Sequence, residues 1–289
     1  PRENLAVNDY WMCDDGRHGW GYVHSDDRIL FPTIGRGESE NLVLWDAAFA
    51  KVKDGISDVR NAHGAEAVAA FASPHLTNEE QFLFGKLITE GLAGTKVALR
   101  STVDSEGDVS FKSGFTIHAD KSPNSRGANE ILNALGVTLT SESDVWDGIR
   151  DGSIKAVLFF GGDPLSKFSD QEKDALRGLE FLVVQDILAS DVSLAADVVL
   201  PGAAFIEKDG TFTNYAGRVQ QISAGLEPPG DARADWRILK DWVNTFGGSL
   251  TLESAAEVMA EVAKDVQVFG NMSMEAVGSA GLQIAGADA

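Results

Sequence analysis

Short apolar runs recur along the chain and alternate with longer segments in which apolar residues return at helical spacing. Leu42, Trp45 and Phe49, for example, lie three or four residues apart, which indicates an amphipathic helix over residues 42–59. Strands separated by helices of about ten or more residues are typical of parallel βαβ units. The pattern therefore predicts an α/β fold with doubly wound, mostly parallel sheets. The predicted strands are Ala67–Phe71, Val97–Leu99, Lys155–Phe160, Phe181–Gln185 and Ala195–Leu200.

Two of the predicted helices begin with a local capping signal. Thr77 is followed three residues later by Glu80, which is the spacing of a capping box, and Ser169 reads as an N-cap for a helix that ends near Gly178. In each case a side-chain oxygen would accept a hydrogen bond from a backbone N–H that has no partner within the helix. Further helices are expected over residues 128–135, 145–151, 232–246 and 252–266.

The remaining segments suggest how the chain is divided. Residues 1–36, in which glycines alternate with large aromatic residues, read as irregular structure that is not helical, and residues 104–128, rich in Ser, Asp and Gly, read as a loop. We predict an α/β domain over residues 37–145 and a second, dinucleotide-binding-like α/β domain over 146–270. The Gly-, Ser- and Ala-containing stretch 271–289 reads as a loose tail.

Charge and cysteine content exclude several classes of protein. The 289 residues carry a formal net charge of −20, and such a surface repels phosphate backbones, so a nucleic-acid partner is not expected. A single cysteine rules out a disulfide framework and fits a reducing compartment. No apolar run approaches the roughly 20 residues that a membrane-spanning helix needs, so no direct membrane span is expected.

The turn Gly161-Gly162-Asp163-Pro164 follows a predicted strand and precedes a predicted helix. Glycines at this place let a backbone approach a ligand, and the helix N-terminus favours an anion, although steric needs alone also select Gly-Gly and Asp163 would repel a phosphate beside it. Asp186 ends the next strand, where an acid accepts hydrogen bonds from a sugar hydroxyl or a base edge, or simply caps a turn. We assign Gly161, Gly162 and Asp186 as candidate cofactor-binding residues.

Arg218 follows the turn signal Lys208-Asp209-Gly210-Thr211 and is the fourth candidate for cofactor binding. Its guanidinium could hold a phosphate or carboxylate through two parallel hydrogen bonds. The alternative is a hairpin in which Arg218 pairs with Asp197 or Glu207. Sequence alone leaves both interpretations open.

Cys13 is the one thiol of the chain, and no histidine lies at a spacing that suits a metal site. A lone cysteine in a reducing compartment is most simply a buried free thiol. An iron–sulfur cluster needs four ligands, so Cys13 would hold one only together with ligands outside this segment.

Several of these segments together resemble the molybdopterin oxidoreductase family. Cys13-Asp14-Asp15-Gly16-Arg17 is similar to the end of that family's iron–sulfur domain, and Gly161–Pro164 is similar to its Gly-x-Asn-Pro loop. Ala196–Pro201 with Glu207–Gln220 resembles its most recognisable segment. Within the family, the likeness points to the large iron–sulfur subunit of NADH:quinone oxidoreductase, respiratory complex I. The residues that carry this likeness are Phe71–Glu80 and Ala119–Ala128.

The resemblance implies a structural and electron-transfer subunit in the peripheral arm of complex I, beside the iron–sulfur chain from NADH to quinone. Residues 1–36 would be the end of an iron–sulfur domain, with Cys13 as the fourth ligand of a [4Fe–4S] cluster. The implied partners are the NADH-oxidising flavin subunit and the quinone-site subunits. The implied location is the cytoplasmic side of the inner membrane, in the peripheral arm of the membrane complex.

Two departures from the family make bound molybdopterin unlikely and favour a vestigial fold without an active site of its own. No cysteine stands in residues 99–104, where the family places a metal ligand and where Ser101 is the nearest substitute. We also expect the family's C-terminal barrel domain to be absent. The alternative is a catalytic, formate dehydrogenase-like molybdopterin oxidoreductase fragment, in which Gly161, Gly162, Asp186 and Arg218 would hold the pterin dinucleotide. The equivalent subunit of an NAD-linked hydrogenase is a further alternative.

Overall fold

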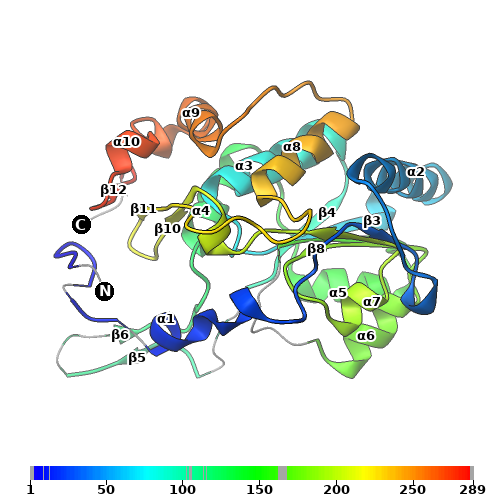
Figure 1. The fold of residues 1–289 in the computed structure, drawn as a ribbon, viewed down its shortest axis with the longest axis horizontal. Helices are drawn as coiled ribbons and strands as arrows, with labels where there is room; N and C mark the ends of the chain where they lie inside the picture. Colours follow the sequence, from blue (N-terminus) through cyan, green and yellow to red (C-terminus); the bar gives the residue numbers. More distant parts are fainter. Residues whose placement is uncertain are drawn as a thin grey trace.

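One large mixed sheet forms the centre of the structure. The structure is a computed structural model that describes residues 3–8, 10–12, 14–101, 103, 106–112, 114, 116–161 and 168–286. The seven strands lie in the order β2-β1-β9-β8-β7-β3-β4 (Figure 1). Their bounds are β1 (Thr33–Ile34), β2 (Asn41–Leu42), β3 (Val68–Ala72), β4 (Lys96–Leu99), β7 (Ala156–Phe160), β8 (Phe181–Asp186) and β9 (Val198–Pro201).

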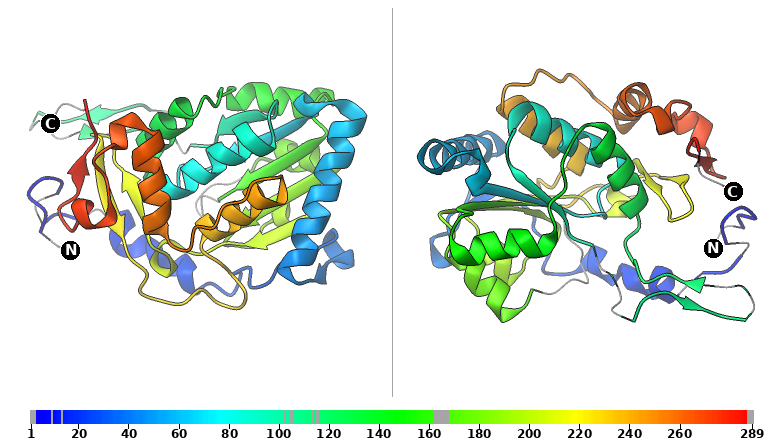
Figure 2. Two further views of the ribbon diagram at one scale, coloured as in Figure 1. Left: turned by 90° about the horizontal axis from the view of Figure 1, so that it is seen from above. Right: turned by 180° about the vertical axis from the view of Figure 1, so that it is seen from behind.

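Five of these strands, β9-β8-β7-β3-β4, run parallel, and β1 and β2 add an antiparallel edge. The residues of β3 and β7 are all buried, because helices cover both faces of the sheet. One layer contains α2, α3 and α8, and the other contains α5, α6 and α7 (Figures 1 and 2). The predicted doubly wound, mostly parallel α/β fold is therefore confirmed. The helices are α2 (Trp45–His63), α3 (Asn78–Lys86), α5 (Glu142–Asp151), α6 (Asp170–Arg177), α7 (Asp191–Leu194) and α8 (Asp235–Thr245).

A second, three-stranded antiparallel sheet lies at one end of the large sheet, in the order β10-β11-β12. The hairpin of β10 and β11 brings the residues that follow β9 against the start of α3, and α4 packs beside it. The bounds are β10 (Gly210–Thr213), β11 (Arg218–Ile222), β12 (Leu282–Gln283), α4 (Ser125–Ala134), α9 (Ala255–Asp265) and α10 (Met274–Val277).

The helix starts follow the sequence signals. The Thr77 hydroxyl accepts a hydrogen bond from the Glu80 backbone N–H, and the Glu80 carboxylate accepts one from the Thr77 backbone N–H, so the predicted capping box is present. Ser169 and Glu172 form the same reciprocal pair at α6. Both helix ends are thus fixed by residues only three positions apart.

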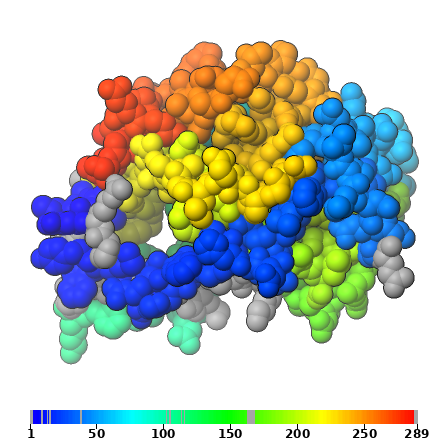
Figure 3. Space-filling model, viewed as in Figure 1, coloured from blue at the N-terminus to red at the C-terminus, as the bar shows by residue number. Residues whose placement is uncertain are grey.

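Three short segments differ from the sequence prediction. Within the stretch predicted to be irregular lie α1 (Asp14–His18) and the 3₁₀ helix η1 (Gly19–His24), and the predicted loop 104–128 contains the small hairpin of β5 (Val109–Ser110) and β6 (Thr116–Ile117). Each element is too short to show a hydrophobic period, so packing rather than pattern decides its conformation. The blue N-terminal stretch lies below the yellow β10–β11 region in Figure 3.

The two predicted α/β domains share one sheet. Strands from 37–145 and from 146–270 lie in the same seven-stranded sheet. The stretch 271–289, predicted to be loose, contains α10 and β12, and its Met272, Val277 and Ile284 are buried. Within the part of the chain that the structure describes, no helix is both long and apolar enough to span a membrane.

Candidate functional site

The strand order reverses between β3 and β7. From β7 the chain proceeds to β8 and β9 in one direction, whereas from β3 it proceeds to β4 in the other. In open α/β sheets, ligands bind outside the carboxyl ends of the strands at such a reversal of strand order. The loops that follow β3, β7, β8 and β9 meet there.

A cavity of about 220 Å³ lies at this place. Its wall is mostly apolar, with a few polar side chains that converge on it, which is the usual make-up of a small-molecule site. The residues that line it are Tyr22, His75, Leu76, Pro123, Gly161, Asp186, Ile187, Ala203, Ala204, Phe205, Lys208, Phe212 and Asp235.

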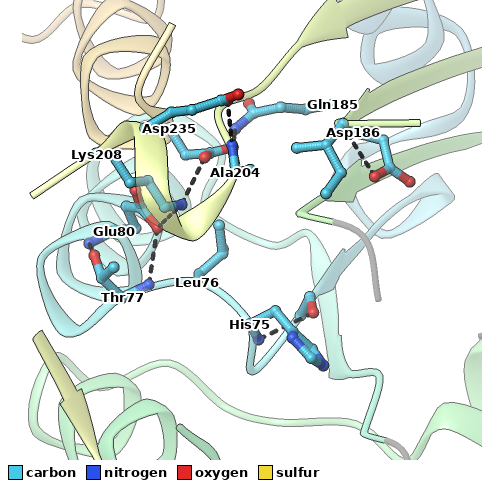
Figure 4. A network of polar contacts seen from close by, with 12 residues as sticks. His75, Leu76, Thr77, Glu80, Gln185, Asp186, Ala204, Lys208 and Asp235 are labelled. Carbon is cyan, nitrogen blue, oxygen red and sulfur yellow. Dashed lines mark hydrogen bonds and ion pairs between the residues drawn. The ribbon is translucent and has the colours of Figure 1, made fainter. Parts of the chain in front are cut away.

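The loop after β3 is fixed by buried hydrogen bonds. The Gln81 side-chain amide donates to the Ser73 carbonyl over 2.8 Å, and the Asn124 amide donates to the Leu76 carbonyl over 2.9 Å. The Ser73 hydroxyl also accepts a hydrogen bond from the His75 backbone N–H (Figure 4). These hydrogen bonds therefore define the path of this wall of the cavity.

Gly161 and Asp186, two of the predicted binding residues, are brought together on the cavity wall. Gly161 has a φ of 71°, and a Cβ there would lie 2.8 Å from Leu76 Cδ2, so both the backbone and the space require glycine. The Asp186 carboxylate accepts a hydrogen bond from the Ile187 backbone N–H, so it supports its own turn (Figure 4), and Asp186 is among the residues that line the cavity. Gly162, with Asp163 and Pro164 beside it, lies outside the described residues.

Arg218 lies elsewhere, at the start of β11. It donates to the backbone carbonyls of Ala280 and Gly281, over 3.3 and 3.1 Å, and is not among the residues that line the cavity. The pairs proposed as its alternative are also absent, because Asp197 is held by Arg36 and Glu207 by Arg28. The predicted hairpin is present, but Arg218 ties it to the segment before β12.

Lys208 also lines the cavity, although it was predicted only as part of a turn. Its ammonium lies 2.8 Å from Glu80 Oε2 and 2.7 Å from Asp235 Oδ2, and all three side chains are buried (Figure 4). Burial lowers the pKa of Lys208, but the nearby Asp235 and Glu80 carboxylates outweigh burial and hold its pKa above the ordinary range. Lys208 is therefore a permanent cation at the cavity.

Asp235 extends this network to the sheet. Its Oδ1 accepts a hydrogen bond of 2.9 Å from the Gln185 side chain, which immediately precedes Asp186 on β8. A Cβ at Gly202 would lie 2.7 Å from the same oxygen, so glycine is needed there too. No local signal reveals these contacts, because Lys208 is 128 residues from Glu80 and 27 from Asp235.

Glu79, next to this network, is a buried carboxyl without a cationic partner among the described residues. Its two oxygens accept hydrogen bonds of 2.9 Å from the Thr211 backbone N–H and hydroxyl. Burial raises the pKa of Glu79 to about 7, because the hydrogen bonds offset only part of the cost of burying the charge. Its protonation therefore changes around neutral pH.

The predicted metal ligand Cys13 lies outside the described residues. Among the residues that the structure does describe, no group of three His, Cys, Asp or Glu side chains is arranged to hold a metal ion.

Comparisons with known proteins give a partial match to one family. Residues 112–244 match the family model "Molybdopterin oxidoreductase". Over 134 residues the chain is 42% identical to the F420-dependent formate dehydrogenase 2 subunit alpha of Methanococcus maripaludis and 40% identical to the NADPH-Fe(3+) oxidoreductase subunit alpha of Geobacter sulfurreducens. These alignments cover 45% of this chain but only 20% and 16% of those proteins, so the match spans a fifth or less of each relative.

Acetylene hydratase from Pelobacter acetylenicus has a similar structure, with a TM-score of 0.63 at 10% identity, over 98% of this chain and 70% of that one. This likeness concerns the fold alone, and it agrees with the predicted fold class. The sequence relatives do not single out complex I, which was the finer prediction. The expectation that molybdopterin is unlikely gains no support from them.

Proposed function

Because residues 112–244 carry a domain of the molybdopterin oxidoreductase family, we propose that this chain is part of a formate dehydrogenase-like α subunit and contributes one lobe of its pterin dinucleotide site. The observation that carries the proposal is the cavity at the reversal of strand order, where Gly161, Asp186 and Lys208 meet. The relatives named as formate dehydrogenases and as an NADPH-Fe(3+) oxidoreductase support an oxidoreductase of this class.

The size of the cavity fits one ring of such a cofactor. Pockets that enclose a drug-sized ligand usually have about 300–1,000 Å³, whereas this cavity has about 220 Å³. A single heterocycle therefore fits, and the rest of a dinucleotide would extend beyond the cavity mouth.

The charges of the cavity wall agree with that arrangement. The residues that line the cavity include two aspartates, Asp186 and Asp235, and one lysine, Lys208, so the ionised wall carries a net negative charge. A phosphate inside the cavity would be repelled, whereas a neutral heterocycle with N–H donors finds acceptors there. The phosphates of the cofactor therefore belong outside it.

This chain's own residues bind and orient the cofactor in this proposal. When bound, the metal–pterin group supplies the redox chemistry. Asp186 accepts hydrogen bonds from the ring, Gly161 lets the ring approach the backbone, and the apolar wall formed by Leu76 and Phe212 excludes water. Ligands for the metal would come from the cofactor.

A second candidate is the vestigial subunit of NADH:quinone oxidoreductase, or its counterpart in an NAD-linked hydrogenase. The observation in its favour is that residues 99–104 contain no cysteine to ligate a metal. In that case the same fold would serve as a scaffold beside iron–sulfur clusters. The flavin and quinone-site subunits would be its partners.

Formate-dependent dye reduction by the natively purified assembly separates the two candidates. We expect turnover with formate and release of a fluorescent pterin on denaturation. NADH-to-quinone activity without formate turnover or pterin would overturn the proposal in favour of the scaffold. Asp186→Asn should lower pterin content, whereas Asp174→Asn, an exposed aspartate on α6 paired with Arg177, should leave it unchanged.

A further inference from the structure

A buried polar interface joins the hairpin of β10 and β11 to α3 and α4, behind the cavity wall (Figure 1). Five polar side chains meet there, each of them 1% exposed or less. They are Asn78 and Glu79 of α3, Thr211 and Thr213 of β10, and Asn124 just before α4. Such a network holds its arrangement only while each buried polar group keeps its hydrogen bonds.

The hydrogen bonds of this interface run in one direction and end on Glu79. The Thr213 hydroxyl donates to Asn78 Oδ1 over 3.1 Å, and the Asn78 amide donates to the Thr211 hydroxyl over 2.9 Å. The Thr211 hydroxyl and backbone N–H in turn donate to Glu79 Oε1 and Oε2, each over 2.9 Å. Glu79 is thus the final acceptor, and its two oxygens hold the start of β10 against α3.

The charged groups on the elements packed against α3 are paired with one another rather than with Glu79. Lys208, which precedes β10, pairs with Glu80 and Asp235. The other pairs are Arg126 with Glu130 on α4, and Lys86 with Glu90 and with Asp265 of α9, while Arg218 of β11 donates to backbone carbonyls. Ionised Glu79 would therefore be a buried charge that no described cation compensates, which is costly.

Movement of the hairpin would relieve this cost, because it would admit water to the Glu79 carboxylate. With the hairpin in place, burial raises the pKa of Glu79 to about 7 from an ordinary value of 4.5, to which it would return on hydration. The closed arrangement therefore binds the proton more tightly than an open one. Its advantage is complete below about pH 4.5 and is lost as the pH rises to 7.

The hairpin can give way separately from the central sheet. It belongs to the small sheet, in which β10 and β11 share four residue pairs and β11 and β12 share two. Elements held by few hydrogen bonds open at a lower free energy than the core of a domain. Phe212 lies between the two buried threonines and lines the cavity, so opening would also displace part of the cavity wall.

We propose that protonation of Glu79 controls the position of the β10–β11 hairpin: loss of the proton favours release of β10 from α3, and its return favours closure. Glu79 acts as a positioning residue, since it holds Thr211 and does not itself line the cavity. The proposal concerns contacts within this chain and involves no bound cofactor. It can therefore fail while the proposed function stands, and the reverse.

Hydrogen exchange of the backbone amides of the full chain, followed by NMR, measures this opening. The reporters are the amides of Thr211 and Thr213, which donate to Glu79 and Asn124, whereas Leu158 in the buried strand β7 reports unfolding of the whole chain. Protection factors correct for the intrinsic effect of pH on exchange. Between pH 5 and 7.5 the protection of the two threonines should fall roughly 10- to 100-fold, because one proton changes the opening equilibrium by at most about tenfold per pH unit.

Glu79→Gln keeps the shape of the side chain and cannot ionise, so the protection of Thr211 and Thr213 should no longer fall with pH. The matched control is Glu130→Gln on α4, which packs beside the same hairpin, because the Glu130 carboxylate pairs with the exposed Arg126. It should keep the wild-type fall. An equally large fall in Glu79→Gln would overturn the proposal.

Two further results would also overturn it. Protection of the threonine amides equal to that of Leu158 at every pH would show that the hairpin opens only when the whole chain unfolds. If Glu79→Gln does not fold, ¹³C spectra of the side-chain carboxyl groups in the wild-type chain decide. The Glu79 signal should titrate over the pH range in which protection falls, and titration that is complete below about pH 5 would contradict the role of Glu79.

Discussion

Lys208 Nζ lies 2.7 Å from Asp235 Oδ2, and both residues line the same cavity although they belong to different elements. The pair joins the loop after β9 to the start of α8, and Glu80 adds the start of α3. The same contacts that shape the cavity therefore hold three parts of the fold together. Stability and ligand binding are consequently linked at this point.

Removal of the Lys208 charge should destabilise the fold strongly. Lys208→Met leaves the Glu80 and Asp235 carboxylates buried without their cation, which typically costs about 3–5 kcal/mol. Urea unfolding followed by circular dichroism measures the difference. The partly exposed Lys86→Met control should cost about 1 kcal/mol or less, and equal losses in the two variants would contradict the buried-network account.

Glu79 should make stability depend on pH in the opposite direction to an ordinary salt-bridged acid. Its folded pKa of about 7 is above its ordinary value of 4.5, so the folded chain binds the extra proton. Its stabilising contribution is fully present below about pH 4.5 and is lost as pH rises through 7. The shift corresponds to about 3 kcal/mol in total.

Glu79→Gln keeps the shape of the side chain and cannot ionise. The free energy of unfolding of this variant, measured by urea titration from pH 5 to 8, should fall less steeply with pH than that of the wild type. Glu66→Gln, a carboxylate on the short turn before β3 and away from this network, is the control and should retain the wild-type slope. Parallel slopes for Glu79→Gln and the wild type would show that Glu79 does not bind the proton.

Gly161→Ala should weaken ligand binding in the cavity by more than backbone strain alone explains. Gly161 and Gly136 have φ angles of 71° and 76°, so alanine is strained at both, at about 1 kcal/mol each. Only at position 161 would the new Cβ meet a neighbour, Leu76 Cδ2 at 2.8 Å, since nothing lies within 4 Å at position 136. Pterin titration should therefore show weaker binding for Gly161→Ala and unchanged binding for Gly136→Ala.

If Cys13 ligates a cluster, as the resemblance implies, Cys13→Ala should remove one [4Fe–4S] signal from the electron paramagnetic resonance spectrum of the native assembly, because a thiolate ligand would be lost. Assembly should stay intact, since the change removes a single side chain. A spectrum identical to that of the wild type would return Cys13 to the interpretation as a free thiol.

The sheet could be predicted from the sequence because buried parallel strands appear as short apolar runs. β3, β7 and β8 each differ by one residue or less at either end from the predicted strands. The helix N-caps Thr77 and Ser169 could also be predicted from the sequence, because their partners are only three residues away. Gly161 and Asp186 could be placed at the same edge because parallel strands have their carboxyl ends together.

The ion-pair network could not be predicted, because its partners are distant in sequence and each has a local explanation. Glu80 read as half of a capping box, and Lys208 read as part of a turn. Arg218 was a candidate because its guanidinium suits a phosphate or carboxylate, whereas the structure ties it to Ala280 and Gly281. Tertiary contacts determine the partners of Glu80, Lys208 and Arg218, and such contacts leave no periodic signal in the sequence.

The molybdenum, tungsten and iron content of the natively purified assembly tests the central claim most directly, by mass spectrometry of the metals with iron as the internal reference. The account predicts about one molybdenum or tungsten for each copy of this chain. Abundant iron with neither molybdenum nor tungsten would contradict it and would make the fold a scaffold without the cofactor.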